Sequence, residues 1–339
     1  MRMTPICGWH RLLARLPVLA IAVLAFSANR ALPATLAEAQ KKLPVILDTD
    51  IGDDIDDTWA LALLLKSPEF DIKLVVGDQG KNLYRARLIA KFLERAGRTD
   101  IPIGIGLDAN AHGEGGQADW VNDFNLNAYP GRVYPDGVRA MIDVIMQSKV
   151  PVTLIGIGPL PNVSEALKRE PRIAAKARFV GMHGSVRVGY DGGKQVSAEY
   201  NVKADAKACQ RVFLASWPIT ITPLDTCGIV HLQGEKYRQV LESGDPIARA
   251  IIENYRIWCA HRTDGGQKSY ETRSSTLFDT VAVYLAFEDR HVTMEELGIR
   301  VTEDGFTRID PAARSVRVAT SWKDMNGFED FLVKRLTSK

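Results

Sequence analysis

The chain has 339 residues, of which 46% are hydrophobic and 25% charged, a composition that excludes a largely disordered protein. Lys and Arg total 43 against 41 Asp and Glu, so the formal net charge is only +2, and no basic run stands out. A nucleic-acid-binding role therefore has no electrostatic support.

Residues 1–37 are interpreted as a signal peptide and N-terminal extension. Three arginines flank the start of an 11-residue apolar run at 16–26, and small residues follow it. The run is short for a membrane span, so we expect cleavage, no stable membrane insertion afterwards, and a periplasmic or secreted protein. An uncleaved anchor is the alternative. The mature chain would keep an odd number of cysteines, and export permits a disulfide, with three buried thiols as the alternative.

Strand-like apolar runs alternate with helical patterns from residue 43 to residue 336. In chain order we expect strand 43–48, helix 56–66, strand 72–77, helix 82–96, strand 101–106, helix 136–148, strand 152–158, helix 162–177, strand 177–182, helix 205–215, strand 219–222, helices 245–260 and 279–288, strands 298–301 and 315–319, and helix 327–336. This order predicts one α/β domain over 43–336, with a Rossmann-like, doubly wound, mostly parallel sheet and helices on both faces.

Three long connections, residues 107–135, 184–198 and 261–276, interrupt this alternation. Loops of this length within a compact domain are usually functional. In doubly wound sheets the ligand lies near loops of this kind, outside the carboxyl ends of the strands. We therefore expect these loops to border the binding site.

Six aspartates crowd the end of the first predicted strand: Asp48, Asp50, Asp53, Asp54, Asp56 and Asp57. Asp48 and Asp50 project to the same side because strand side chains alternate. A helix dipole would stabilise Asp56 and Asp57, but it does not account for six like charges, which repel unless a cation lies among them. Oxygen ligands without His or Cys predict a hard cation, Ca²⁺ or Mg²⁺.

Two other interpretations of this stretch stay open. The first is a purely structural acidic turn. The second is a phosphatase with an aspartyl nucleophile, which also places Asp-x-Asp after a first strand. That class typically has Thr or Val where this chain has Gly52, and no clear downstream Lys and acidic pair follow. The spacing does not fit an EF-hand loop.

Five motifs in order resemble those of the inosine-uridine nucleoside hydrolases. ILDTDIGDDIDD at 46–57 is similar to the family's Asp-x-Asp-x-Gly-x-Asp-Asp signature, in a version two residues longer. LIGIGPLPN at 154–162, VGMHGS at 180–185, SAEYNVKADAKA at 197–208 and LFDTVAV at 277–283 also resemble family segments. The resemblance covers nearly the whole predicted domain. It implies hydrolysis of the N-glycosidic bond of ribonucleosides.

The resemblance implies a Ca²⁺ site held by Asp50, Asp57, Asp279 and the backbone carbonyl of Ile157. Asp50 would also be the general base for a calcium-bound water that attacks the anomeric carbon. Such a mechanism suits a sugar transition state with oxocarbenium character, which nearby carboxylates stabilise.

The remaining implied contacts concern the substrate. Asp56, Asn201 and Asp279 would hold ribose hydroxyls and Glu199 the 5′-hydroxyl, while Asp78 falls where the family has an Asn near the base pocket. Capping of a turn or helix is the alternative role for Asn201 and Asp279.

Three further residues, Met182, His112 and Trp258, are candidates for substrate contacts. Met182 belongs to the motif at 180–185, and His112 lies in a Gly-rich loop where a substrate contact is plausible. Trp258, like Trp120 and Tyr255, is a candidate to stack on a base, with core packing as the alternative for each.

Phe278 departs from the family pattern, because nonspecific members have a His there that protonates the leaving base. The chain would then use another acid or take substrates whose base leaves easily. A purine activated by stacking on Trp258 or Trp120 is one such substrate, and nicotinamide riboside is another. A calcium-dependent ribosyl-binding protein without catalysis is a further alternative, although no duplicated half indicates it. Family members are often dimers or tetramers, and a homo-oligomer is possible for this chain.

Overall fold

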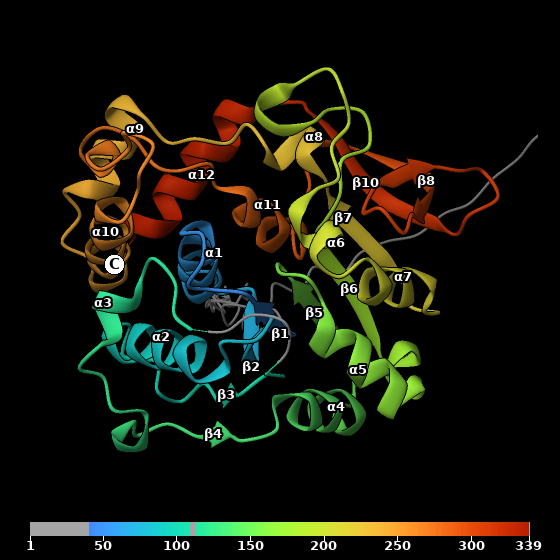
Figure 1. Cartoon of the computed structure of the whole chain (residues 1–339), viewed down its shortest axis with the longest axis horizontal. Helices are drawn as coiled ribbons and strands as arrows, with labels where there is room; N and C mark the ends of the chain where they lie inside the picture. Colours follow the sequence, from blue (N-terminus) through green and yellow to red (C-terminus); the bar gives the residue numbers. More distant parts are fainter. Residues whose placement is uncertain (1–40, 109–112, 339) are drawn as a thin grey trace, which may run out of the picture. The chain divides into compact units, whose positions relative to one another are not determined.

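The computed structural model describes residues 41–108 and 113–338 (Figure 1). The predicted signal peptide and His112 therefore lie outside the described residues. Within them, no helix combines the length and apolar character needed to cross a bilayer. Cys209, Cys227 and Cys259 are buried free thiols, so the chain follows the alternative without a disulfide.

One ten-stranded sheet organises the described residues, in the order β4-β3-β2-β1-β5-β6-β7-β10-β8-β9. Pairing is parallel from β4 to β10, whereas β8 and β9 are antiparallel to their neighbours. The strands are β1 Leu43–Thr49, β2 Phe70–Gly77, β3 Ile103–Gly104, β4 Val133–Tyr134, β5 Val152–Gly156, β6 Ala177–Met182, β7 Ile219–Thr222, β8 Val292–Val301, β9 Thr307–Ile309 and β10 Ser315–Trp322. The predicted doubly wound, mostly parallel sheet is confirmed.

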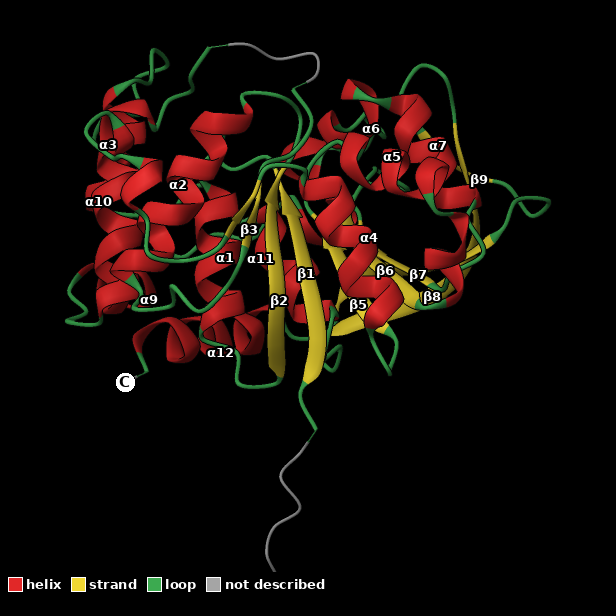
Figure 2. Cartoon of the chain, turned by 90° about the horizontal axis from the view of Figure 1, so that it is seen from below, coloured by secondary structure: helices red, strands yellow, loops and turns green. Residues whose placement is uncertain are grey.

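Helices cover both faces of this sheet (Figure 2). Helices α1, α2, α10, α11 and α12 contribute to the core on one face, and α4, α5 and α7 to the core on the other. The α-helices are α1 Asp56–Leu65, α2 Asn82–Arg95, α3 Ala118–Val121, α4 Gly137–Gln147, α5 Pro161–Arg169, α6 Tyr200–Ala204, α7 Ala206–Leu214, α8 Leu224–Cys227, α9 Gly234–Leu241, α10 Pro246–Ala260, α11 Phe278–Leu285 and α12 Met325–Thr337.

Strand β1 contributes side chains to both cores. Val45 and Leu47 pack into one core and Ile46 into the other, because successive strand side chains point to opposite faces. All three side chains are fully buried, which explains why the strand is apolar along its length instead of alternating.

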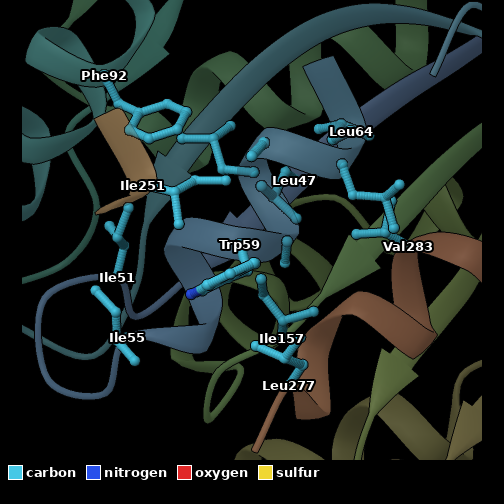
Figure 3. Close-up of a cluster of buried hydrophobic side chains, with 14 of the residues drawn as sticks. Leu47, Ile51, Ile55, Trp59, Leu64, Phe92, Ile157, Ile251, Leu277 and Val283 are labelled. Carbon is cyan, nitrogen blue, oxygen red and sulfur yellow. The ribbon is translucent and has the colours of Figure 1, made fainter. Parts of the chain in front are cut away.

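Helix α1 is buried on all sides, and this is unusual for a helix next to a sheet. It contacts α10, α11 and α12 as well as lying beside the sheet core. Figure 3 shows its Trp59 among side chains of other elements, including Ile157 and Leu277. The apolar residues of α1 therefore fix its axis, and with it the position of the two aspartates that begin the helix.

Two predicted elements differ from the structure for local reasons. The predicted helix 162–177 ends at Arg169, and a 3₁₀ helix covers Pro171–Ala175. Glu170 leaves the helical region with φ −144°, as expected before a proline, whose ring disfavours that conformation. The C-terminal strands form an antiparallel extension, with β8 beginning at Val292, well before the predicted residue 298.

The chain reverses direction across the sheet beside β1. From β1 it proceeds outward through β2, β3 and β4, and then returns to β5 on the other side of β1. In open α/β sheets the crevice at such a switch point, outside the carboxyl ends of the strands, is where ligands bind. The loops after β1 and β5 meet at this crevice.

Burial of α1 can be tested with one pair of leucine variants. Leu64 of α1 is fully buried, whereas Leu214 of α7 is 76% exposed. Leu64→Ala should lower the free energy of unfolding by about 2–5 kcal/mol, because it leaves a cavity in the core. Leu214→Ala should change it by about 0.5 kcal/mol or less. Urea denaturation measures both, and equal losses would contradict the placement of α1.

Candidate active site

A cavity of about 370 Å³ opens at the switch point, a volume suited to a small ligand. Its wall combines carboxylates with aromatic side chains. The lining residues are Asp50, Asp53, Asp54, Asp56, Asp57, Ile157, Met182, Tyr190, Glu199, Tyr200, Asn201, Trp258, Phe278 and Asp279.

The β1–α1 loop, residues 50–55, turns sharply at Gly52, whose φ of 120° is unfavourable for other residues. The Tyr84 hydroxyl donates to the Gly52 carbonyl at 2.9 Å, and a Cβ at Gly52 would collide with that ring. Gln117, fully buried, donates from Nε2 to the Asp54 carbonyl at 2.7 Å. Side chains distant in sequence therefore fix both halves of the loop.

Arg85 of α2 is the positive charge behind this loop, and its side chain is fully buried. Its guanidinium donates to the carbonyls of Asp50 and Ile51, the latter at 2.9 Å, and to the Asp53 carboxylate at 2.8 Å. Lys81 also pairs with Asp53. Burial raises the pKa of Asp53, but these two cations outweigh it and hold the pKa below its ordinary value.

Asp56, Asp57 and Asp279 form a buried group whose oxygens can lie within 4.8 Å of one another. The Asp279 backbone N–H donates to Asp56 at 3.3 Å, and the Thr49 hydroxyl donates to Asp57. Burial, followed by repulsion from neighbouring aspartates that include Asp50, raises the pKa of all three carboxyls well above the ordinary aspartate range. Oxygen donors at this spacing and burial fit a divalent cation.

Asp50 lies beside this group and faces the end of β5. A Cβ placed on Gly158 would lie 2.9 Å from an Asp50 carboxylate oxygen, so only glycine allows this approach. Burial raises the pKa of Asp50 to about 6, although Arg85 opposes the shift. Asp50 is therefore a carboxylate poised to exchange a proton near neutral pH.

Glu199 and Asn201 form the opposite wall, where the SAEYN segment begins α6. Glu199 caps this helix, accepting from the N–H groups of Asn201 at 2.7 Å and Gly184 at 2.9 Å. Burial raises its pKa to about 7. Asn201 donates through Nδ2 to the carbonyls of Ile157 at 3.2 Å and Met182 at 3.1 Å, which joins the ends of β5 and β6.

Aromatic side chains line the remaining wall. Phe278 meets Tyr190 edge-on, with ring centroids 6.3 Å apart. The Trp258 indole N–H donates to the Asp53 carbonyl at 2.9 Å, which ties α10 to the β1–α1 loop. Tyr200 donates its backbone N–H to the Tyr190 hydroxyl at 2.8 Å.

The structure brings most of the predicted site residues into one cavity. Asp50, Asp56, Asp57, Ile157, Met182, Glu199, Asn201, Trp258 and Asp279 all line it. Asp78 does not: it is fully buried, and neither of its carboxylate oxygens has a partner in the described part of the chain. Trp120 and Tyr255 are buried in the core, as their alternative role predicted.

Tyr190 and Tyr200 were missed by the sequence analysis. A signal existed for each, because Tyr190 lies in the predicted functional loop 184–198 and Tyr200 lies inside the SAEYN motif. Nothing in the local pattern showed that both rings would face the cavity.

The fold and the cavity together define a doubly wound α/β protein with a carboxylate-lined pocket that can hold a cation and a small molecule. The family model for inosine-uridine preferring nucleoside hydrolases matches residues 45–329, and the chain belongs to this family. It is an enzyme that hydrolyses the N-glycosidic bond of ribonucleosides.

Relatives and solved structures agree with this assignment. The chain is 31% identical over 228 residues to a pyrimidine-specific ribonucleoside hydrolase RihA of Enterobacter sp. (strain 638), covering 62% of this chain and 69% of the relative. A plant nucleoside hydrolase has a similar structure, with a TM-score of 0.72 and 20% identity over 88% of this chain and 100% of its own. The structure of a purine-preferring ribonucleoside hydrolase from Gardnerella vaginalis is also similar, with a TM-score of 0.70 and 20% sequence identity. The match covers 87% of this chain and 98% of the other.

The buried carboxylates predict how stability depends on pH. Asp56, Asp57 and Asp279 have pKa values raised above the ordinary value of 3.8, so the metal-free folded chain binds more protons than the unfolded chain. Stability must therefore fall as pH rises above that value. With chelator, the unfolding temperature should drop by several degrees between about pH 5 and about pH 8.

A bound divalent cation should remove most of this loss, because it stabilises the ionised carboxylates. Thermal unfolding at both pH values, with chelator and with Ca²⁺, measures the effect. An unfolding temperature that rises with pH in the presence of chelator would contradict the burial of these charges.

Proposed function

We propose that this enzyme cleaves ribonucleosides to free base and ribose at the switch-point cavity, with Asp50 as general base and Ca²⁺ as its metal. The observation that carries this proposal is the set of buried carboxylates that line the cavity, three of them within 4.8 Å at the starts of α1 and α11. Such a set is strongly unfavourable unless it binds a cation, and it faces a cavity of suitable size.

Asp50, Asp57, Asp279 and the Ile157 carbonyl would hold the cation. All are oxygen donors that line the cavity, and no His or Cys side chain lines it among the described residues, which favours Ca²⁺ or Mg²⁺ over a softer metal. Ca²⁺ suits the larger number of oxygens, since Asp56 of the three-carboxylate group lies beside them. When bound, the cation lowers the pKa of water and orients it.

Asp50 would act on the attacking water. Burial raises its pKa to about 6 in the metal-free chain, which still leaves it mostly ionised at neutral pH, and a bound cation would favour the ionised form further. The ionised carboxylate can accept a proton from the water. The water oxygen forms a bond to the anomeric carbon, and one of its protons goes to Asp50. The bond from that carbon to the base nitrogen breaks, the base takes the electron pair, and the base of a neutral nucleoside gains a proton from solvent. Positive charge develops on the sugar meanwhile, and the surrounding carboxylates are fixed where that charge appears.

The polar wall would hold the ribose. Asp56 and Asp279 offer paired acceptors for a diol, and Asn201 is pinned between the ends of β5 and β6 by its two carbonyl contacts. Glu199 already accepts backbone N–H groups, which orient its carboxylate for a 5′-hydroxyl. Contacts that hold the sugar in this way also orient its anomeric carbon toward the attacking water.

The aromatic wall would receive the base. Trp258, Tyr190 and Phe278 offer ring faces or edges to a planar heterocycle. The relatives and similar structures include a pyrimidine-specific and a purine-preferring hydrolase, so they do not decide the base. Asp78, which does not line the cavity, and His112, outside the described residues, are not needed for these roles. Export and a homo-oligomer remain proposals that rest on the sequence.

Asp50→Asn tests the general base directly. It keeps the side chain's shape and removes the basic oxygen, so kcat for inosine or uridine should fall by about a thousandfold. Release of reducing sugar in the presence of Ca²⁺ measures the rate, and Asp123→Asn is the matched control, since its side chain is 88% exposed on the surface. Near-wild-type turnover in Asp50→Asn would refute this role.

A further inference from the structure

We propose that Asp54 selects ribosides whose base is a positively charged heterocycle, joined to the ribose through a quaternary ring nitrogen. This inference rests on the proposed function, because it names the substrate class of the same cavity. The β1–α1 loop, which belongs to a signature two residues longer than the family's, carries two neighbouring carboxylates, Asp53 and Asp54. The inference follows from the different contacts that these two carboxylates make.

The first of these carboxylates anchors the loop. Asp53 is paired with Lys81 and with the buried Arg85, and its carbonyl accepts from the Trp258 indole. Its charge is therefore compensated by the protein, and its role is structural. The anchor holds the next residue in place at the cavity.

Asp54 also lines the cavity. In the described part of the chain, no ion pair compensates its charge. One of its carboxylate oxygens accepts the Ile55 N–H at 2.7 Å, and buried Gln117 holds its carbonyl. Burial is the main cause that raises the pKa of Asp56 and of Tyr190, and the Asp54 charge adds to both shifts, after that of Glu199 in the case of Tyr190. Asp54 thus borders the same cavity as the polar wall and the aromatic wall.

The aromatic wall suits the same kind of base. Tyr190, Phe278 and Trp258 line the cavity, and aromatic faces attract cations through their ring quadrupole. Arg262 is the opposing charge, since its guanidinium lies 4.7 Å from the centroid of the Trp258 ring. It is paired with Asp264, although its charge also opposes the rise that burial causes in the pKa of Asp54. Asp54 is therefore a carboxylate of this cavity that has no ion pair of its own in the described part of the chain.

A cationic base also matches the chemistry of the leaving group. Phe278 lies at the cavity wall and carries no proton to donate. When the bond between the anomeric carbon and a quaternary nitrogen breaks, the base takes the electron pair and leaves neutral. The water's proton goes to Asp50, so the reaction balances without an acid on the base side.

The experiment compares a cationic with a neutral substrate in three forms of the enzyme, with Ca²⁺ present. The ratio of kcat/KM for nicotinamide riboside to that for inosine should fall about tenfold in Asp54→Asn, because the attraction between opposite charges is lost. In Asp54→Glu, which keeps the charge, the ratio should stay within about threefold of the wild-type value. An unchanged ratio in Asp54→Asn would overturn the proposal.

A binding measurement on the wild-type enzyme gives a second test that needs neither a variant nor turnover. 1-Methylnicotinamide is a permanent cation, and 3-methylbenzamide is its neutral isostere. With ribose and Ca²⁺ present, the cation should bind about tenfold more tightly by calorimetry. Equal affinities would overturn the role of Asp54. Failure to hydrolyse any riboside would instead overturn the proposed function.

Discussion

The repulsion among carboxylates buried at the carboxyl ends of β1 and β2 is the constraint on which the rest of the site depends. Asp48, Asp50 and Asp78 end neighbouring strands and are nearly or fully buried, and α1 begins with two more buried aspartates. Burial is the leading cause that raises the pKa of Asp48, Asp50 and Asp78, and the charges of neighbouring aspartates add to it. A fold that keeps this arrangement must supply positive charge from somewhere.

Arg85 supplies that charge from the protein side. It is fully buried and bonds to the backbone on which Asp50 is carried, instead of pairing with the Asp50 carboxylate. The carboxylates thus stay free toward the cavity while their loop is held from behind. One guanidinium cannot balance so many carboxylates, so negative charge is left on the side that faces the cavity, where a cation can bind. The same excess of negative charge weakens the metal-free fold and gives the site its affinity for metal.

Sequence alone predicted the part of the site that follows from strand ends and from motifs. Asp50 and Ile157 end strands that a parallel sheet brings together, and Asp56 and Asp57 begin a helix whose apolar residues predict its burial. The role of Arg85 could not be predicted, because its pattern is that of any helix and its partners in the β1–α1 loop lie more than 30 residues away. The break at Glu170 was a missed local signal, since Pro171 is visible in the sequence.

The cavity has a polar wall and an aromatic wall, and largely different parts of the fold position them. The polar wall comes from the ends of β1, β5 and β6 and from the starts of α1, α6 and α11, so altering it would disturb the sheet itself. Most of the aromatic wall comes from the loop at Tyr190 and the end of α10 at Trp258, which lie outside the strands, while Phe278 begins α11 beside Asp279. Substitutions there leave the sheet intact. Base preference can therefore diverge while the chemistry at the anomeric carbon stays the same, and a Phe at position 278 is compatible with an unaltered carboxylate site.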